Sequence, residues 1–482
     1  MWWLIACGPA PHDEPSPPTS ATDPMSAPPS TTTPPPPAPV SGCAVDRWDP
    51  ATFSTVIDVG PGYAASTPSD VPWESLTPST LVRIQPGEYH DKWAIDVAGT
   101  EADPIVVIGI CVPATGALPV IDGADAITRL ELDFWSETRG VLKIGGTSTG
   151  SAVVPSWIFV EDLEFRGGRA GNSFVDESGA DDAYDDNAAA IFVEEGQNVT
   201  IRGCTLADSG NGLFAAHETR ALLVSSNHIF GNGNVDSAYE HNNYTEALGI
   251  VFEYNRFGPL CDGCSGNNLK DRSAGLVVRY NWIEGGNRQL DLVESDFDDI
   301  RDDPSYRETF VYGNILVEPD GDGNSQIAHY GGDNGDESIY RQGTLFFYHN
   351  TVVSERVGNT TLFRLSTSAE LADVRNNIVY AAGNLAVLDA EGSASLATNW
   401  LTAGWADSFQ GAAFTGSVTE AGGNVEGEDP MFSVDYALDP ASPARGIAGP
   451  LADGAPPVAS QYLVHQGGAA RTSTADAGAV EP

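Results

Sequence analysis

Basic residues are scarce in this chain of 482 residues, where 23 Lys and Arg face 67 Asp and Glu and the net charge is −44. Proteins that bind nucleic acid need a basic surface, so the charge balance excludes that class of partner. Apolar runs are short, and none reaches the ~18 residues of a membrane-spanning helix. An acidic polymer would meet repulsion over most of this surface, so binding it requires a local cluster of cations or bridging metal ions.

The composition favours short strands over long helices. The chain contains 52 Gly and 33 Pro, and its β-branched residues occur in short runs. Such a mixture is typical of many short strands joined by turns. The hydrophobic fraction of 41% is sufficient for a core.

The start of the chain resembles an exported lipoprotein. Leu4-Ile5-Ala6-Cys7 matches a bacterial lipobox, in which Cys7 would be acylated. Residues 8–42 are rich in Pro, Ser and Thr, which is typical of an extended tether without a core. Only six residues precede Cys7, so either the true start lies upstream or the match is a chance one. We expect residues 1–7 to be a remnant signal and lipobox, and the protein to be secreted and anchored to the cell envelope by lipid alone.

Export permits disulfides, and the chain has six cysteines. Cys43 and Cys111 flank the first globular segment, and we expect them to pair. Cys261 and Cys264 lie in a Gly-rich loop, where a disulfide would act as a staple. A second CxxC motif is missing, which argues against a zinc site.

A repeated pattern sets the expected fold. An apolar residue is followed by Asn three residues later and by a second apolar residue two further on, with Asn at positions 227, 255, 281, 314, 350 and 377. Subtraction gives intervals of 28, 26, 33, 36 and 27 residues, which are typical of a solenoid. Stacked coils bury an apolar face that no single coil can bury alone, and asparagines at one turn can bond to their copies above and below. Cys204 occupies such a position in a variant coil, so we expect a buried free thiol.

Asparagine ladders of this kind are familiar in right-handed parallel β-helices, and the chain resembles the bacterial proteins of this pectate-lyase-like superfamily. The leucine spacing of leucine-rich repeats and the longer repeats of a β-propeller are both missing. The resemblance implies an all-β, right-handed parallel β-helix with caps at both ends. We expect an N-terminal cap and first coils at 43–125, the β-helix body at 126–425 and a closing segment at 426–482. Capped solenoids are usually monomers, and we expect one here.

A series of polar motifs resembles consecutive coils in one group of bacterial β-helix proteins. The chain departs from that group at Asn267, Asp271 and the pair Val293-Glu294. No single activity is shared across the group, so the resemblance implies the fold more than the chemistry. The matching residues are His241, Asn242, Tyr244, Asn268, Lys270, Arg272, Asp291, Leu292, Tyr330 and Gly331.

Counting to the ladder predicts which of these side chains stack. Tyr244 and Lys270 each lie 11 residues before a ladder Asn, and Glu246 and Arg272 each lie 9 before the same two. Tyr244 should therefore stack on Lys270, and Glu246 on Arg272, at the ~4.8 Å spacing of strands. Aligning the next coil places Asp291 above Lys270.

A cationic pair ringed by Tyr, His, Asn and carboxylates suits β-elimination of a uronic acid. That reaction needs a base at C5, a cation for the adjacent carboxylate and an acid for the leaving oxygen. We expect Lys270 to be the base, Arg272 to bind the uronate carboxylate, and Tyr244 or His241 to be the acid. The residues expected to bind the substrate are Asn242, Asn268, Asp291, Glu246 and Tyr330.

The favoured function is thus a polysaccharide lyase, or a related uronate epimerase, that acts on an acidic polysaccharide. Cross-strand ion pairs that merely neutralise a surface would explain the same residues. A non-catalytic glycan-binding or adhesive protein on the envelope is the main alternative. A glycoside hydrolase is a weaker one, because a compact Asp-Asp motif next to a His is missing.

Calcium is the expected cofactor if there is one. Asp320, Asp322 and Asn324 offer oxygen ligands on a Gly-rich loop, which suits a hard cation. The loop lacks the downstream Glu of an EF-hand and lies among strands. Solvated acidic loops explain the same residues.

Overall fold

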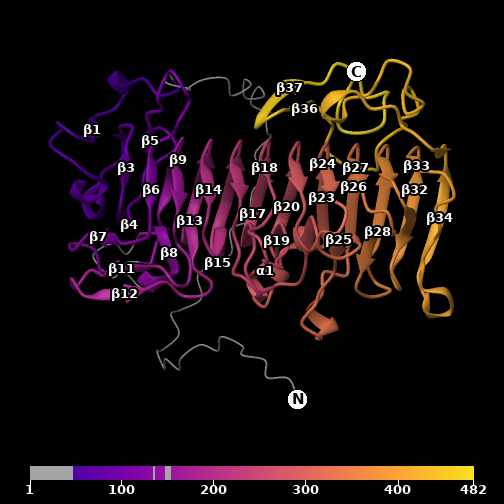
Figure 1. The fold of residues 1–482 in the computed structure, drawn as a ribbon, viewed down its shortest axis with the longest axis horizontal. Coiled ribbons are helices and arrows are strands. Elements are labelled where there is room, and N and C mark those ends of the chain that lie inside the picture. The colour runs from indigo at the N-terminus through magenta and orange to yellow at the C-terminus, as the bar shows by residue number, and fades with distance from the viewer. Residues whose placement is uncertain (1–46, 134–135, 147–152) are drawn as a thin grey trace, which may run out of the picture. The chain divides into compact units, whose positions relative to one another are not determined.

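The computed structural model describes residues 47–133, 136–146 and 153–482, all of which belong to one compact unit. The unit is a solenoid whose coils follow one another in chain order (Figure 1). Nearly all strands pair in parallel with the strands of the neighbouring coils. The predicted right-handed parallel β-helix is confirmed.

Three rows of strands form the faces of the solenoid. The first row carries the site described below, and consists of β4 (Asp91–Ile95), β8 (Gly140–Ile144), β13 (Ala189–Arg202), β15 (Asn211–Ser225), β17 (Asn243–Glu253), β19 (Leu269–Asp271), β22 (Leu290–Leu292), β25 (Gln326–Tyr330), β28 (Asn359–Leu365) and β31 (Asn384–Leu388).

The second row shares the long strands β13, β15 and β17 with the first, because these three strands extend across both faces. Its other members are β1 (Thr55–Val59), β2 (Thr80–Ile84), β5 (Ile105–Gly109), β9 (Ser156–Glu161), β20 (Ala274–Arg279), β23 (Glu308–Tyr312), β26 (Thr344–Tyr348), β29 (Leu371–Arg375), β32 (Ser393–Ala397) and β34 (Ser417–Gly422).

The third row is a separate sheet of short strands. It contains β3 (Glu88–Tyr89), β6 (Val120–Asp122), β10 (Glu164–Arg166), β14 (Thr205–Ala207), β16 (His228–Phe230), β18 (Arg256–Phe257), β21 (Trp282–Glu284), β24 (Ile315–Glu318), β27 (Thr351–Ser354), β30 (Ile378–Ala381), β33 (Trp400–Thr402) and β35 (Val425–Gly427).

Short elements decorate the coils. The strands outside the three rows are β7 (Ala126–Thr128), β11 (Ser173–Val175), β12 (Asp181–Ala183), β36 (Ser460–Leu463) and β37 (Gly467–Ala470). The one α-helix of the described ranges is α1 (Asp298–Arg301), and the 3-10 turns are η1 (Pro50–Thr52), η2 (Pro68–Asp70), η3 (Trp73–Ser75), η4 (Glu137–Arg139), η5 (Pro304–Arg307), η6 (Glu337–Ile339), η7 (Gly411–Ala413) and η8 (Val434–Tyr436). No helix in these ranges is long and apolar enough to cross a membrane.

An asparagine ladder holds neighbouring coils in register. The side-chain amide of each ladder Asn donates to the Oδ1 atom of the next, over 2.9–3.1 Å, and the ladder runs through Asn227, Asn255, Asn281, Asn314, Asn350, Asn377, Asn399 and Asn424. Each amide also donates to a backbone carbonyl in an adjacent coil, as Asn281 does to Phe252. The predicted ladder is confirmed, and it continues two coils further than the pattern indicated.

Each ladder Asn follows a residue in the left-handed region. Before Asn281 this residue is Tyr280, with φ of 54°, and before Asn350 it is His349, with φ of 49°. Such a conformation costs a non-glycine residue roughly 1–2 kcal/mol. The buried hydrogen bonds of the ladder compensate for this cost at every turn.

The last residues of the chain run back along the outside of the coils (Figure 1). The backbone N–H of Ala459 donates to the phenol oxygen of Tyr280, and the Tyr348 hydroxyl donates to the carbonyl of Pro456. These two tyrosines belong to a row of ring contacts, Tyr254–Tyr280–Tyr312–Tyr348, which packs with Val458 of the closing segment. The closing segment therefore covers an aromatic strip that would otherwise be exposed.

The cysteines divide into two kinds. Cys261 and Cys264 form the predicted disulfide, and Cys204 is the predicted buried free thiol. Its backbone N–H donates to Asn227, so Cys204 stands at the start of the ladder. Cys111 is disulfide-bonded, whereas its predicted partner Cys43 lies outside the described residues, as do Cys7 and the tether 8–42.

Replacing a ladder residue should be costly. We expect Asn281→Ala to lower the free energy of unfolding by about 3 kcal/mol or more, because several buried hydrogen-bonding groups lose their partner. The measurement is the midpoint of urea unfolding. Asn384→Ala is the matched control, since Asn384 is exposed and its side chain donates to that of Asn359, its partner on the neighbouring strand β28. Equal shifts in the two variants would contradict a special role for the ladder.

Candidate functional site

An outward-facing row of polar side chains crosses the first face of the solenoid. Tyr244, Lys270, Asp291, His329 and Arg364 occupy equivalent positions on β17, β19, β22, β25 and β28. The predicted stacking of Tyr244 on Lys270, and of Lys270 on Asp291, is confirmed. The row extends two coils further than predicted.

A second pair stands beside the first two members of this row. Thr245 pairs with Asp271 and Leu248 with Ala274, which is an offset of 26 residues in both cases (271 − 245 and 274 − 248). The same offset places Glu246 opposite Arg272, as predicted. Arg272 directly follows β19, and its guanidinium lies 5.7 Å from the centre of the Tyr244 ring. We call this group of four side chains the outer square: Tyr244, Glu246, Lys270 and Arg272.

Lys270 is held as a cation. Its Nζ atom donates to Oδ2 of Asp291 over 2.7 Å and to Oδ2 of Asp333 over 3.0 Å. Burial acts to lower the pKa of Lys270, but these two carboxylates outweigh it and raise the pKa above its ordinary value. A general base must be unprotonated, and the two carboxylates hold Lys270 in its protonated form, so the geometry opposes the predicted role of Lys270 as the base.

Arg272 is less completely neutralised than Lys270. Its Nη1 atom donates to the carbonyl of Glu294 over 2.7 Å. Its nearest carboxylates lie 3.7–3.9 Å away, on Glu294, Asp296 and Asp333. The Nε atom is buried, and it has no hydrogen-bond partner among the described residues. The binding of a uronate carboxylate by Arg272 stays a prediction.

Glu246 exchanges its proton near neutral pH. Burial raises the pKa of Glu246 to about 7, although Arg272 and the hydroxyl of Ser295, which donates to Glu246, act in the opposite direction. A carboxyl group with this pKa is matched to proton transfer at neutral pH. Sequence analysis placed Glu246 in the site only as a substrate contact, because its burial by the insertion between β22 and β23 could not be foreseen.

His241 is neutral and buried. Its Nδ1 atom accepts the backbone N–H of Asn267 over 2.9 Å. Burial lowers the pKa of His241 to about 3, and the nearby charge of Lys270 adds to the effect. The burial of His241 and the charge of Lys270 therefore oppose an imidazolium acid at this position, which was one of the two acids predicted. The ring instead contacts Tyr244 edge-on, with 5.5 Å between centroids.

Three predicted substrate contacts lie in the interior. Asn242 and Asn268 are fully buried and belong to a second, shorter ladder that begins at Asn232, with 3.0 Å at each step. Tyr330 is also fully buried, in register with Leu292 of the core. Their burial leaves these three residues no surface for the predicted contact with substrate.

Asp291 anchors a buried relay that sequence analysis missed. Its Oδ1 atom accepts from Nδ1 of His329 over 2.8 Å, and Nε2 of His329 lies 2.8 Å from the hydroxyl of Ser366. Burial lowers the pKa of His329, so the neutral ring donates at Nδ1 and accepts at Nε2. Asp291 itself is 1% exposed, which leaves it no surface for the predicted substrate contact. Its role is to fix Lys270.

The relay ends on the loop that follows β25. The backbone N–H of Gly332 donates to the Ser366 hydroxyl over 2.9 Å. This contact holds the next residue, Asp333, against Lys270. The side chain of Asp333 is 37% exposed, and the two nearby cations lower its pKa despite partial burial. Sequence analysis also missed Asp333, because the sequence pattern places Asp333 in a loop but does not show which way its side chain points.

One group of metal-binding side chains converges among the described residues: Asp291, His329 and Asp333. The ammonium of Lys270 bonds to both carboxylates of this group. A positive charge therefore already stands where a cation would bind.

Each of the three side chains predicted to bind calcium forms a hydrogen bond with a different residue. Asp320 accepts the backbone N–H of Val357 over 3.2 Å, and Asp322 accepts that of Gly286 over 3.0 Å. Asn324 donates to the side chain of Asn287. Calcium binding at this loop stays a prediction.

Comparison with known proteins adds likenesses in fold only. No family model matches the chain, and neither does any curated protein sequence. A structure of the pectate lyase Pel9A covers 89% of this chain and 96% of its own, at 12% identity and a TM-score of 0.48. An alginate lyase from Paenibacillus sp. str. FPU-7 covers 77% and 99%, at 11% identity and 0.35. A Yersinia enterocolitica family 28 exopolygalacturonase covers 76% and 78%, at 8% identity and 0.38. The chemistry of this chain must therefore be inferred from its own residues.

The buried ion pair can be tested by stability. We expect Lys270→Met to lower the free energy of unfolding by about 3–5 kcal/mol, because Asp291 loses its cation in a buried position. Urea unfolding measures the change, and adding Asp291→Asn should recover part of the loss. Arg220→Met is the control and should cost about 1 kcal/mol or less, because Arg220 and Asp299 form a half-exposed pair. If Lys270→Met lowered the free energy of unfolding no more than Arg220→Met does, the buried ion pair of Lys270 with Asp291 would be contradicted.

Proposed function

We propose that this protein cleaves a uronate-containing acidic polysaccharide by β-elimination at the outer square. The supporting observation is the square itself. It gathers two cations, a carboxyl group that titrates near pH 7 and a phenol on one outer face. Such a gathering of cations stands out in a chain where acids outnumber Lys and Arg by 67 to 23.

Each corner of the square has a chemical role in this proposal. Arg272 and Lys270 bind the uronate carboxylate and neutralise the charge that develops when C5 loses its proton. The carboxylate of Glu246 takes that proton. The C5–H electrons form the double bond between C4 and C5, the bond from C4 to the glycosidic oxygen breaks, and the Tyr244 hydroxyl supplies the proton to that oxygen. Solvent then restores both side chains.

The position of Asp333 supports the binding of an anionic group at the outer square. Its carboxylate lies 3.0 Å from Nζ of Lys270 and 3.9 Å from Nη2 of Arg272. It is the more exposed of the two carboxylates bonded to Lys270. A uronate carboxylate that entered the square would take the position of Asp333 and meet the same two cations.

The main alternative is a glycan-binding protein without catalysis. The ion pairs of Lys270 with Asp291 and Asp333 favour this alternative, since the two carboxylates already neutralise the charge of Lys270. We also propose that the protein is secreted, carries a lipid anchor at Cys7 and is a monomer. These three properties are compatible with both functions. The Cys261–Cys264 disulfide agrees with export.

The test is whether the soluble chain from Cys43 onward forms unsaturated uronate from an acidic polysaccharide. The product is measured by its ultraviolet absorbance. We expect the rate to rise as pH increases through about 7, because Glu246 must be deprotonated to act as the base. Glu246→Gln should lower kcat by about 100-fold or more, the usual contribution of a general base.

Glu195→Gln serves as the matched control, because Glu195 is half-buried on the same face, and it should leave kcat unchanged. Calcium and a chelator are compared in parallel, which tests the expected cofactor. Absorbance that never rises on any acidic polysaccharide, with the glycan still bound, would replace the lyase by the binding function. A rate that does not depend on Glu246 would overturn the assigned base.

A further inference from the structure

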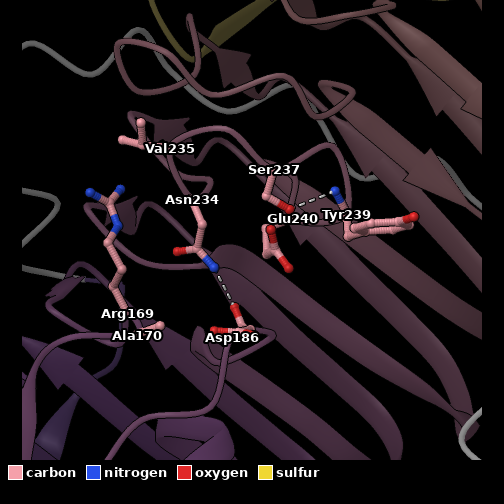
Figure 2. A pocket seen from close by; sticks show the side chains of 8 residues that line it. All are labelled: Arg169, Ala170, Asp186, Asn234, Val235, Ser237, Tyr239 and Glu240. Atoms are coloured by element: carbon pink, nitrogen blue, oxygen red, sulfur yellow. Dashed lines mark hydrogen bonds between the residues drawn. The ribbon is translucent and has the colours of Figure 1, made fainter. Parts of the chain in front are cut away.

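A hollow of about 500 Å³ opens beside the outer square, between the loop that precedes β17 and two residues of earlier coils, Arg169 and Asp186 (Figure 2). Glu240 lines it and is only 5% exposed. The Oε2 atom of Glu240 is buried, and it has no hydrogen-bond partner within the described ranges. A buried carboxylate oxygen without a partner is costly, so it indicates a donor that is supplied from outside the chain.

The walls of the hollow are built and held in place. Asn234 donates to the carbonyl of Asp186 over 2.8 Å, and Ser237 accepts the backbone N–H of Tyr239 over 3.2 Å (Figure 2). Arg169 donates to the carbonyl of Gly231 over 2.8 Å. These contacts use backbone groups and leave the Asp186 carboxylate available, whereas the Ser237 side chain also interacts with the Glu240 carboxyl group.

The chemistry of the lining selects an uncharged ligand that is rich in hydroxyl groups. Glu240 and Asp186 are acceptors for hydroxyl donors, and their negative charge repels a uronate carboxylate. The cation of the lining, Arg169, is already paired with Asp208 over 3.0 Å. Tyr239 is 81% exposed at the rim, where its ring offers an apolar surface with a polar tip. A neutral sugar residue presents hydroxyl donors and an apolar ring face, which matches these three side chains.

The hollow and the outer square are neighbours. Glu240 directly precedes His241, whose ring lies 5.5 Å from that of Tyr244, and the Arg272 guanidinium lies 5.7 Å from the Tyr244 ring. Tyr244 follows Glu240 by four residues (244 − 240), a span of at most ~14 Å, which a few residues of one polysaccharide chain can bridge.

We propose that the hollow is a subsite for an uncharged sugar residue next to the uronate. The proposal rests on the function assigned to the outer square, and it narrows the substrate class. The preferred polymer alternates uronate with neutral sugar residues, because a polymer of uronate alone would place a carboxylate against Glu240 and Asp186.

The experiment compares two alternating polymers, hyaluronan and unsulfated chondroitin, with two homouronans, polygalacturonate and polymannuronate. We expect kcat/KM to be at least about tenfold higher on the better alternating polymer, since a tenfold ratio needs only ~1.4 kcal/mol of selective binding. Glu240→Gln should raise KM on that polymer by about fivefold with kcat unchanged, a loss equivalent to about one hydrogen bond. Glu101→Gln, at an exposed acid of the first coils, is the control.

Binding of hyaluronan hexasaccharide by calorimetry separates the two proposals. If no polymer is cleaved but Glu240→Gln weakens hexasaccharide binding while Glu101→Gln does not, the subsite stands and the lyase assignment fails. If cleavage occurs with equal kcat/KM on both polymer classes, and Glu240→Gln changes neither KM nor hexasaccharide affinity, the subsite is overturned and the lyase stands. Binding that is absent in the unmodified chain overturns the subsite as well.

Discussion

The register between coils is the constraint on which the rest of this molecule depends. Side-chain amides at one turn bond to their copies in the next coil, and this ladder of buried hydrogen bonds joins eight asparagines from Asn227 to Asn424. Loops of very different length leave the coils, yet each new strand starts at the same place relative to the ladder. Chemistry on the outer face can therefore be assembled from residues of separate coils, as Glu246 and Arg272 illustrate.

Much of the fold and part of the site could be predicted from this regularity. Counting back from the ladder correctly stacked Tyr244 on Lys270, because no insertion separates either residue from its ladder Asn. Aligning Leu290 with Leu269 correctly placed Asp291 on Lys270. The count fails across the insertion between β22 and β23, so His329 and Asp333 were missed. Inward and outward positions also look alike in a pattern, which is why Asn242 was predicted to bind substrate although it is buried.

Protonation states could not be predicted, because they depend on burial and on partners from distant coils. Lys270 lies against Asp291 and Asp333, and the second of these comes from a loop 63 residues away. All three lysines of the chain are buried, and burial lowers the pKa of Lys92 and Lys143, whereas the carboxylates beside Lys270 raise its pKa. The same burial acts on a carboxyl group in the opposite sense, and raises the pKa of Glu246 to about 7. The candidate acid–base group is thus the carboxyl, and the candidate charge-neutralising groups are the cations.

The most direct test of this account is a crystal structure of the Glu246→Gln variant with a bound uronate oligosaccharide. The account predicts a uronate carboxylate within hydrogen-bond distance of Arg272 and Lys270, with Asp333 displaced and the Tyr244 hydroxyl near the glycosidic oxygen. An oligosaccharide bound to another face of the solenoid, with the Lys270–Asp333 ion pair intact, would contradict it.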